Sequence, residues 1–126
     1  MSEIPDNLKY TEEHEWIKVS DGEARYGITD HAQDELGDIV YVELPEVGEE
    51  ISKGDMLGVI ESVKTVSDLY APLSGTVKDV NVELEVGPEM MNEDPYGDGW
   101  IVVIEIADED ELDELLDPEE YEETFE

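Results

Sequence analysis

The sequence predicts a mainly β fold, a β-sandwich or flattened barrel decorated with a few helices. Short strand-like runs recur at close spacing, turn residues separate them, and helical patterns occur once early and twice at the end. No linker-like stretch divides the 126 residues. We therefore expect one domain over residues 1–126, with a β core over about 14–106 and helices over about 108–125.

A hairpin and a short helix are expected near the amino end. Residues 14–19 combine a tryptophan with β-branched residues, residues 20–23 are turn formers, and residues 24–28 return as a partner strand. Thr29 or Asp30 can cap the short helix that follows.

The middle of the chain predicts further strands. The run from Asp38 to Leu44 alternates, with Ile39, Tyr41 and Glu43 on one face. The other extended segments are expected at residues 51–52, 56–61, 66–70, 76–82 and 100–106. Between the last two, residues 86–99 are rich in turn formers and predict a loop.

Two helices are expected at the carboxyl end. Asp108 and Glu111 resemble a capping pair, and Asp117 precedes Pro118 as a cap precedes a first-turn proline. The apolar residues of these helices fall at helical spacing: Leu112, Leu115 and Leu116 in the first, and Tyr121 and Phe125 in the second.

The charge excludes several classes of partner. The chain has 38 acidic and 6 basic residues, a net charge of −32, and −20 remains when the acidic residues 108–126 are set aside. Nucleic acids and anionic membranes bind through clusters of Lys and Arg, so neither is expected as a partner. The acidic side chains repel one another less in concentrated salt, where the screening length falls to roughly 3 Å. The composition therefore resembles that of proteins from halophiles.

Other absences narrow the function. The chain has no cysteine, which excludes disulfides and thiolate chemistry. Residues 1–6 do not resemble a signal peptide and no apolar run reaches membrane-spanning length, so a soluble cytoplasmic protein is expected. His14 and His31 lack metal-ligand spacing and are interpreted as structural; no metal site and no catalytic residue are predicted.

Lys64 occupies the tip of a predicted hairpin. Residues 56–61 form one arm, residues 66–70 the other, and 62–65 show no strand pattern. A lysine is usually a solvated surface charge, but its amine on a flexible stem is also a good acylation site. A long acyl arm on a rigid tip would raise the effective concentration of its cargo at partner sites.

The segment 61–68, Glu-Ser-Val-Lys-Thr-Val-Ser-Asp, followed by Ala-Pro-Leu-Ser-Gly at 71–75, resembles the lipoylation hairpin of glycine cleavage H proteins. Segments in matching order extend the resemblance over nearly the whole chain: 14–16, 27–38, 41–48, 95–101 and 111–121.

This resemblance implies a lipoyl-domain-like barrel-sandwich hybrid with a hammerhead-like β core, one short internal helix and two terminal helices. It implies a non-catalytic carrier with lipoate attached to Lys64 through an amide bond. It also implies four classes of partner: a pyridoxal-phosphate glycine decarboxylase, a folate-dependent aminomethyltransferase, dihydrolipoyl dehydrogenase and the lipoyl-attaching enzymes. Such a carrier passes an aminomethyl group and reducing equivalents between the decarboxylase, the aminomethyltransferase and the dehydrogenase.

Three acids match family positions near the arm. Glu61 lies where lipoyl domains carry an acid that aids recognition by the attaching enzyme. Glu15 and Asp68 lie where a carboxylate could hold the amine of the loaded arm by a charge-assisted hydrogen bond. In a chain with 38 acids, each is also readily explained as a solvated surface charge.

Alternative functions remain open at this point. Lipoyl domains of 2-oxo acid dehydrogenases and biotin carriers commonly have Asp-Lys-Ala or Met-Lys-Met at the tip, whereas residues 63–65 read Val-Lys-Thr here. An H-like protein that serves as a lipoyl donor or a regulatory binding module shares the same motif. An unmodified acidic structural or ion-buffering protein would leave the order of motifs unexplained.

Overall fold

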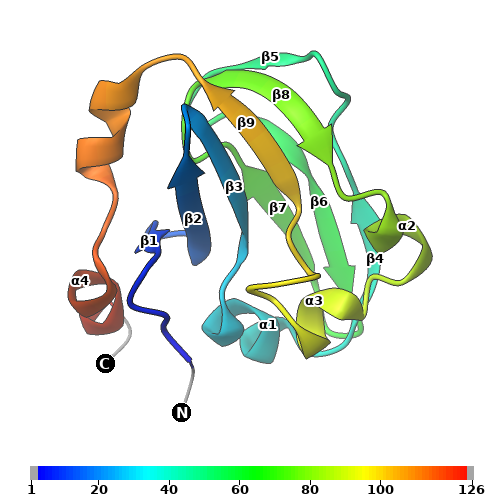
Figure 1. Cartoon of the computed structure of the whole chain (residues 1–126). Coiled ribbons are helices and arrows are strands. Elements are labelled where there is room, and N and C mark those ends of the chain that lie inside the picture. Colours follow the sequence, from blue (N-terminus) through cyan, green and yellow to red (C-terminus); the bar gives the residue numbers. More distant parts are fainter. Residues whose placement is uncertain (1–2, 125–126) are drawn as a thin grey trace.

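Two antiparallel β-sheets lie one behind the other in the computed structural model, which describes residues 3–124 (Figure 1). Within these residues the larger sheet has six strands in the order β1-β2-β3-β9-β8-β5, and the smaller has three in the order β4-β6-β7. The larger sheet is built from β1 (Lys9–Tyr10), β2 (Glu15–Ser20), β3 (Glu23–Ile28), β5 (Glu50–Ile51), β8 (Gly75–Val80) and β9 (Val102–Ile106). The smaller sheet is built from β4 (Ile39–Glu43), β6 (Met56–Ser62) and β7 (Val66–Tyr70). The prediction of a mainly β fold is confirmed.

The β2–β3 hairpin forms as predicted. Ser20 pairs with Glu23, and the two residues between them both have positive φ, 50° at Asp21 and 78° at Gly22. Turns with two positive φ angles match the twist of a hairpin, and Asp-Gly is a preferred sequence for them.

The alternation predicted for β4 is wrong. Ile39 and Val42 are both buried, whereas Val40 and Tyr41 between them are exposed. The register against β6 shifts between Ile39 and Tyr41, so a bulge places the two buried residues three positions apart.

Helix α1 (Asp30–Leu36) is capped at Thr29, whose hydroxyl oxygen accepts a hydrogen bond from the amide of Ala32 at 3.2 Å. The loop predicted over residues 86–99 instead contains single-turn helices. These are α2 (Glu83–Val86), which begins before that segment, and α3 (Met90–Glu93). Each buries one apolar side chain, Leu84 or Met91, and four residues are too few to show a helical period in the sequence. These two helices are additional to α1, the one short internal helix that was expected.

The two terminal helices differ in type. The first, η1 (Glu109–Glu114), is a 3₁₀ helix, and α4 (Pro118–Glu123) begins with the predicted Asp117 cap, completed as a capping box by Glu120. Asp108 accepts a hydrogen bond from the Asp110 amide, but its predicted partner does not complete the cap. The Glu111 carboxylate instead accepts hydrogen bonds from the amide and hydroxyl of Ser74, at 2.6 and 2.8 Å. Phe125, predicted to extend the last helix, lies outside the described residues.

Side chains pack in two apolar clusters. The larger fills the space between the sheets, and Leu112 and Leu115 pack with it. The smaller contains Leu8, Tyr10, Trp16 and Tyr121, with Leu116 packed against it. The predicted leucine face is thus divided between the two clusters. Trp16 is buried, and the partly buried Trp100 has the Arg25 guanidinium 5.0 Å from its ring centroid.

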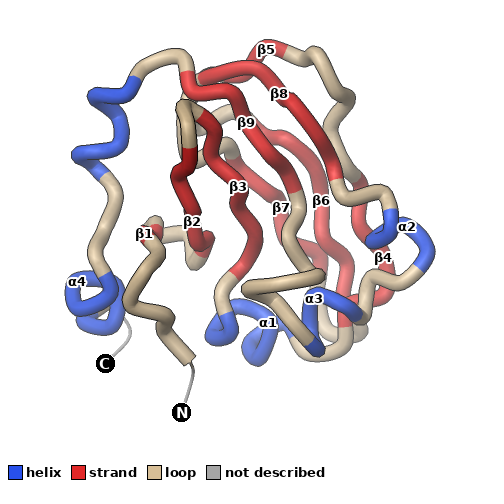
Figure 2. Tube along the Cα trace, in the orientation of Figure 1, coloured by secondary structure: helices blue, strands red, loops and turns tan. Residues whose placement is uncertain are grey.

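Helices α1 and α3 lie together at one end of the strands, the end where β6 meets β7 (Figure 2). Among residues 3–124, no helix is both long and apolar enough to cross a membrane.

Candidate functional site

Lys64 lies on the tight turn that joins β6 to β7. The Ser62 amide donates to the Thr65 carbonyl at 2.8 Å, which closes the turn. The Ser62 hydroxyl oxygen accepts from the amides of Lys64 and Thr65, at 3.2 and 3.1 Å. Lys64 itself is exposed. The turn therefore fixes the backbone of this lysine while its amine remains accessible.

Residues at the carboxyl end of α1 contact this turn. The Val63 amide donates to the Asp38 carbonyl at 3.0 Å. The Lys64 side chain crosses Gly37, where an added Cβ would lie 3.1 Å from its Cε and 3.6 Å from its Nζ. Gly37 has φ of 77°, which favours glycine, and it ends α1, where the partial negative charge of the helix favours a cation.

Asn92 of α3 holds the junction between α1 and β4. Its side-chain amide donates to the Gly37 carbonyl at 2.8 Å and to Gln33 Oε1 at 3.1 Å, and its Oδ1 accepts from the Ile39 amide at 2.9 Å. Asn92 was not predicted from the sequence, because it falls in the segment interpreted as loop and its partners lie more than 50 positions away.

Glu61 lies on the outer face of the small sheet, three residues before Lys64. It pairs with Tyr41 of β4 on one side and with Val66 of β7 on the other. Both neighbours are exposed, 48% and 61% respectively, whereas Glu61 is half-buried. A surface with apolar groups around one carboxylate thus adjoins the lysine.

Glu15 is the most unusual acid of the described chain. It begins β2 and is only 4% exposed. Burial raises the pKa of Glu15 to about 8. The hydrogen bond from Thr11 and a backbone hydrogen bond from Tyr70 lower this pKa, and the nearby charge of Glu13 raises it. The Thr11 hydroxyl donates to Oε1 at 3.3 Å. At neutral pH this carboxyl therefore holds its proton for most of the time.

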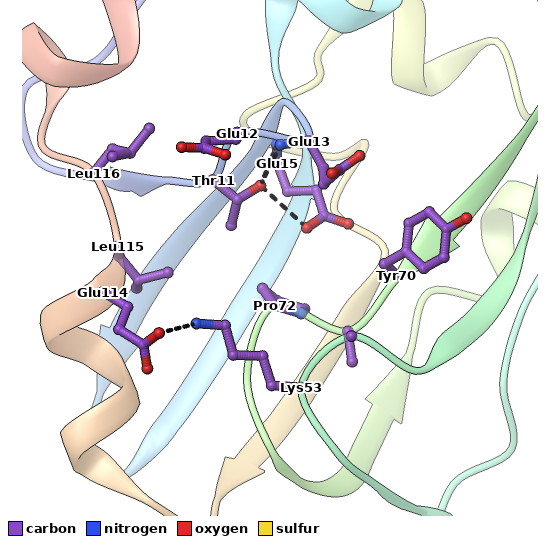
Figure 3. Close-up of a pocket in the computed structure, with 12 residues that line it drawn as sticks. Thr11, Glu12, Glu13, Glu15, Lys53, Tyr70, Pro72, Glu114, Leu115 and Leu116 are labelled. Atoms are coloured by element: carbon purple, nitrogen blue, oxygen red, sulfur yellow. Dashed lines mark hydrogen bonds and ion pairs between the residues drawn. The ribbon is translucent and has the colours of Figure 1, made fainter. Parts of the chain in front are cut away.

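A hollow of about 520 Å³ opens on one side of Glu15 (Figure 3). Glu15, Pro72 and Tyr70 all line it; in this view Pro72 lies between the Glu15 carboxylate and Lys53, and the Tyr70 ring points away from Glu15. On the opposite side, Lys53 and Glu114 form an ion pair at 2.9 Å. The hollow thus combines apolar walls with charged groups from distant segments.

A second hollow of about 250 Å³ lies between α1 and β7 and is also lined by Glu15. Asp68 lies on its rim, exposed, and accepts a hydrogen bond from the Tyr70 hydroxyl at 3.3 Å. Leu36 and Ser67 lie in its wall, each close in sequence to the residues that frame Lys64. The fold thus brings Glu15 and Asp68 to one hollow beside the lysine turn, although they lie 53 positions apart in the sequence.

His14 and His31 also line the second hollow. Their ring centroids are 4.8 Å apart, His14 Nδ1 lies 2.8 Å from the Tyr121 hydroxyl, and His31 Nε2 lies 3.3 Å from Glu35 Oε1. Burial and the neighbouring His31 lower the pKa of His14, while Glu35 and Glu13 raise it. Within the described part of the chain, no three His, Cys, Asp or Glu side chains are grouped as a metal ion requires.

Comparisons with known proteins agree on one family. A family model described as glycine cleavage H-protein matches residues 8–126. The glycine cleavage system H protein of Carboxydothermus hydrogenoformans is 60% identical over 126 residues, covering 100% of this chain and 97% of that one. The probable glycine cleavage system H protein of Haloarcula marismortui is 52% identical, covering 98% of each chain.

Structure comparison agrees with the sequence matches. The crystal structure of a glycine cleavage system H protein from Mycobacterium marinum superposes with a TM-score of 0.87 at 43% identity, covering 96% of this chain and 98% of that one. The expected barrel-sandwich architecture is confirmed by this match.

Proposed function

Because this chain belongs to the glycine cleavage H-protein family, we propose that Lys64 holds a lipoyl group through an amide bond at Nζ. The chain is a lipoyl-bearing shuttle of glycine cleavage, a carrier component and not a catalyst. The family implies lipoate as the cofactor and other components of the system as partners.

The observation that carries the assignment to Lys64 is an exposed amine on a turn fixed by its own hydrogen bonds and by the end of α1. Two other lysines are engaged in ion pairs, Lys53 with Glu114 and Lys78 with Glu105. Lipoate, once attached, supplies a disulfide that can be reduced as it takes up an aminomethyl group. The chain itself provides attachment, a fixed origin for the arm and an adjacent hollow.

We assign the partners by the chemistry of this cycle. They are a pyridoxal-phosphate glycine decarboxylase, a folate-dependent aminomethyltransferase, dihydrolipoyl dehydrogenase and the lipoyl-attaching enzymes. Glu61 is assigned to recognition by the attaching enzymes, supported by its position beside Lys64 between two exposed apolar residues. We place the chain in the cytoplasm as a single carrier unit, and cell fractionation of the native host tests that placement.

Glu15 and Asp68 are assigned to contact with the loaded arm. Both line the hollow beside the lysine turn, and an ionised carboxylate there can accept a charge-assisted hydrogen bond from a protonated amine. Burial of the loaded arm would also slow its decomposition by water. The double variant Glu15→Gln with Asp68→Asn should shorten the lifetime of the loaded carrier, and an unchanged lifetime would contradict this assignment.

The decisive experiment is the intact mass of protein purified from its native host, with peptide mapping around Lys64. A lipoyl-sized addition on Lys64 is expected. A fully unmodified Lys64 from lipoate-replete cells would contradict the proposal. A reconstituted glycine decarboxylation assay then separates the shuttle from a protein that only donates lipoate or regulates a partner, because such a protein would not support turnover.

The acidic surface supports a proposal about working conditions, namely a cytoplasm of high salt. The net charge of −32 disfavours the compact state at low ionic strength, and salt screens that repulsion. The free energy of unfolding should therefore rise from low to multimolar KCl. Unchanged stability over that range would contradict the proposal.

A further inference from the structure

The hydroxyl of Tyr26 is a buried polar group without a hydrogen-bond partner among the described residues. Tyr26 lies in β3 with its side chain completely buried. An unpaired hydroxyl inside a protein costs free energy, and native structures keep few of them. A hydroxyl in this position is therefore expected to gain a partner in another state of the protein.

Glu15 is a candidate for that partner. Tyr26 pairs with Ile17 across the β2–β3 hairpin, and Glu15 lies two residues before Ile17, on the same face of β2. Diagonal neighbours on one face of an antiparallel pair are within reach of a long aromatic side chain. Burial and the nearby Glu15 carboxylate raise the pKa of Tyr26 well above its usual value, which agrees with this proximity.

Glu15 also has capacity for a further donor. Its present donors are the Thr11 hydroxyl, at 3.3 Å, and the backbone of Tyr70. An ionised carboxylate has about four acceptor sites, so two donors leave it incompletely satisfied. A protonated carboxyl needs fewer donors, because its own O–H is a donor.

The charged and titratable groups facing Glu15 are mostly acids. They line the two hollows: Glu12, Glu13, Lys53, Tyr70 and Glu114 in the first, and His14, His31, Glu35 and Asp68 in the second. The charge of Glu13 opposes ionisation of Glu15, and an uncharged donor from β3 would favour it.

We propose that Tyr26 is a positioning residue for Glu15, whose hydroxyl donates a hydrogen bond to the Glu15 carboxylate when a primary ammonium group enters the adjoining hollow. This rests on the carrier function proposed above, in which the loaded state presents such an ammonium. Glu15 releases its proton to solvent, the ammonium keeps its protons and Tyr26 keeps its O–H, so one proton leaves for each cation bound. Tyr26 thereby favours a bound cation over an empty hollow.

The test follows the ionisation of Glu15 in the unmodified full-length chain. Glutamate carboxyls are labelled with ¹³C, the Glu15 signal is assigned with Glu15→Gln, and the pH is varied from about 5 to about 10. Tyr26→Phe should raise the midpoint of Glu15 by about one pH unit, because a donor to the charged form is lost. n-Butylammonium chloride should lower the midpoint more in the native chain than in Tyr26→Phe, with sodium chloride at the same ionic strength as reference.

Tyr10→Phe is the matched control. Tyr10 is also completely buried, but its hydroxyl donates to the Pro5 carbonyl at 2.6 Å. This variant should leave the Glu15 midpoint unchanged. A Tyr26→Phe midpoint that is unchanged or lowered would overturn the proposal. Because Lys64 carries no acyl group in this experiment, its failure would leave the carrier assignment standing, and an unmodified Lys64 in the native host would leave this result unaffected.

Discussion

Lys64 and Glu15 are side chains that both carry a charge in water at neutral pH, but the fold places them in opposite environments. Lys64 lies exposed on a turn whose side-chain hydrogen bonds come from Ser62, two residues away. Glu15 is 4% exposed, and its environment is assembled from Thr11, Tyr70 and Tyr26 on three separate segments. The lysine side chain is exposed to solvent, whereas the carboxyl is buried in the packed interior.

This contrast separates two kinds of functional residue. Lys64 depends on local geometry, so replacing it should change activity and leave stability unaffected. Glu15 is part of the packed interior, so replacing it should alter the stability of the fold and the pH dependence of that stability.

Lys64→Arg should abolish the acyl addition and all glycine decarboxylation activity, because a guanidinium is not an acylation site. The free energy of unfolding should change by less than about 0.5 kcal/mol, since the side chain is exposed. Intact mass, reconstituted decarboxylation and urea unfolding give the three readouts. Retained activity would contradict the assignment, and a large loss of stability would break the contrast.

Glu15→Gln should remove a pH dependence of stability. Burial raises the pKa of Glu15 to about 8, so the folded state holds a proton that the unfolded state releases above about pH 4.5. The native chain should therefore lose stability as pH rises from about 4.5 to about 8, by at most about 5 kcal/mol from this group, and level off above it. The variant should lack that loss when urea unfolding of both is compared at fixed salt. Parallel profiles would show that Glu15 ionises normally.

Gly37→Ala should destabilise the fold by about 1–3 kcal/mol, because φ of 77° with ψ of −157° is a conformation that residues with a Cβ avoid. Its Cβ would also lie 3.1 Å from Lys64 Cε and displace that side chain. The rate of Lys64 acetylation by a chemical reagent, followed by mass spectrometry, should change.

Gly22→Ala is the control for that change. Its φ is 78°, and an added Cβ meets nothing within 4 Å. It should cost stability without altering the acetylation rate of Lys64. Equal rates in both variants would mean that Gly37 does not support the lysine.

Ser62→Ala should have the smallest effect, a loss of about 1 kcal/mol from two hydrogen bonds to exposed amides. Amide hydrogen exchange should accelerate at Lys64 and Thr65 and remain unchanged in the core of β6. Ser20→Ala, at the exposed end of β2, provides the reference. Faster exchange throughout β6 would show that the Ser62 hydroxyl stabilises the sheet as well as the turn.

The sequence predicted the parts of the molecule that depend on near neighbours. The Asp21-Gly22 turn and the Asp117 cap before Pro118 are specified by residues a few positions apart, and both were predicted in place; the Glu120 half of the capping box was not predicted. The partner of Glu111 was missed because Ser74 lies 37 positions away and competes with a local cap. Lys64 was identified through a contiguous motif. Tyr26 was missed because its importance arises from an unpaired hydroxyl, which only packing creates.

The pairing of β3 with β9 joins residues 23–26 to residues 102–105, whereas the β6–β7 hairpin joins positions at most 14 apart. Closing a long loop costs more entropy than closing a short one, and synthesis proceeds from the amino end. On a translating ribosome the lysine hairpin can therefore form before the six-stranded sheet is complete. An attaching enzyme that needs only the turn would find it in a nascent chain, whereas one that also needs the completed six-stranded sheet would have to wait for β9.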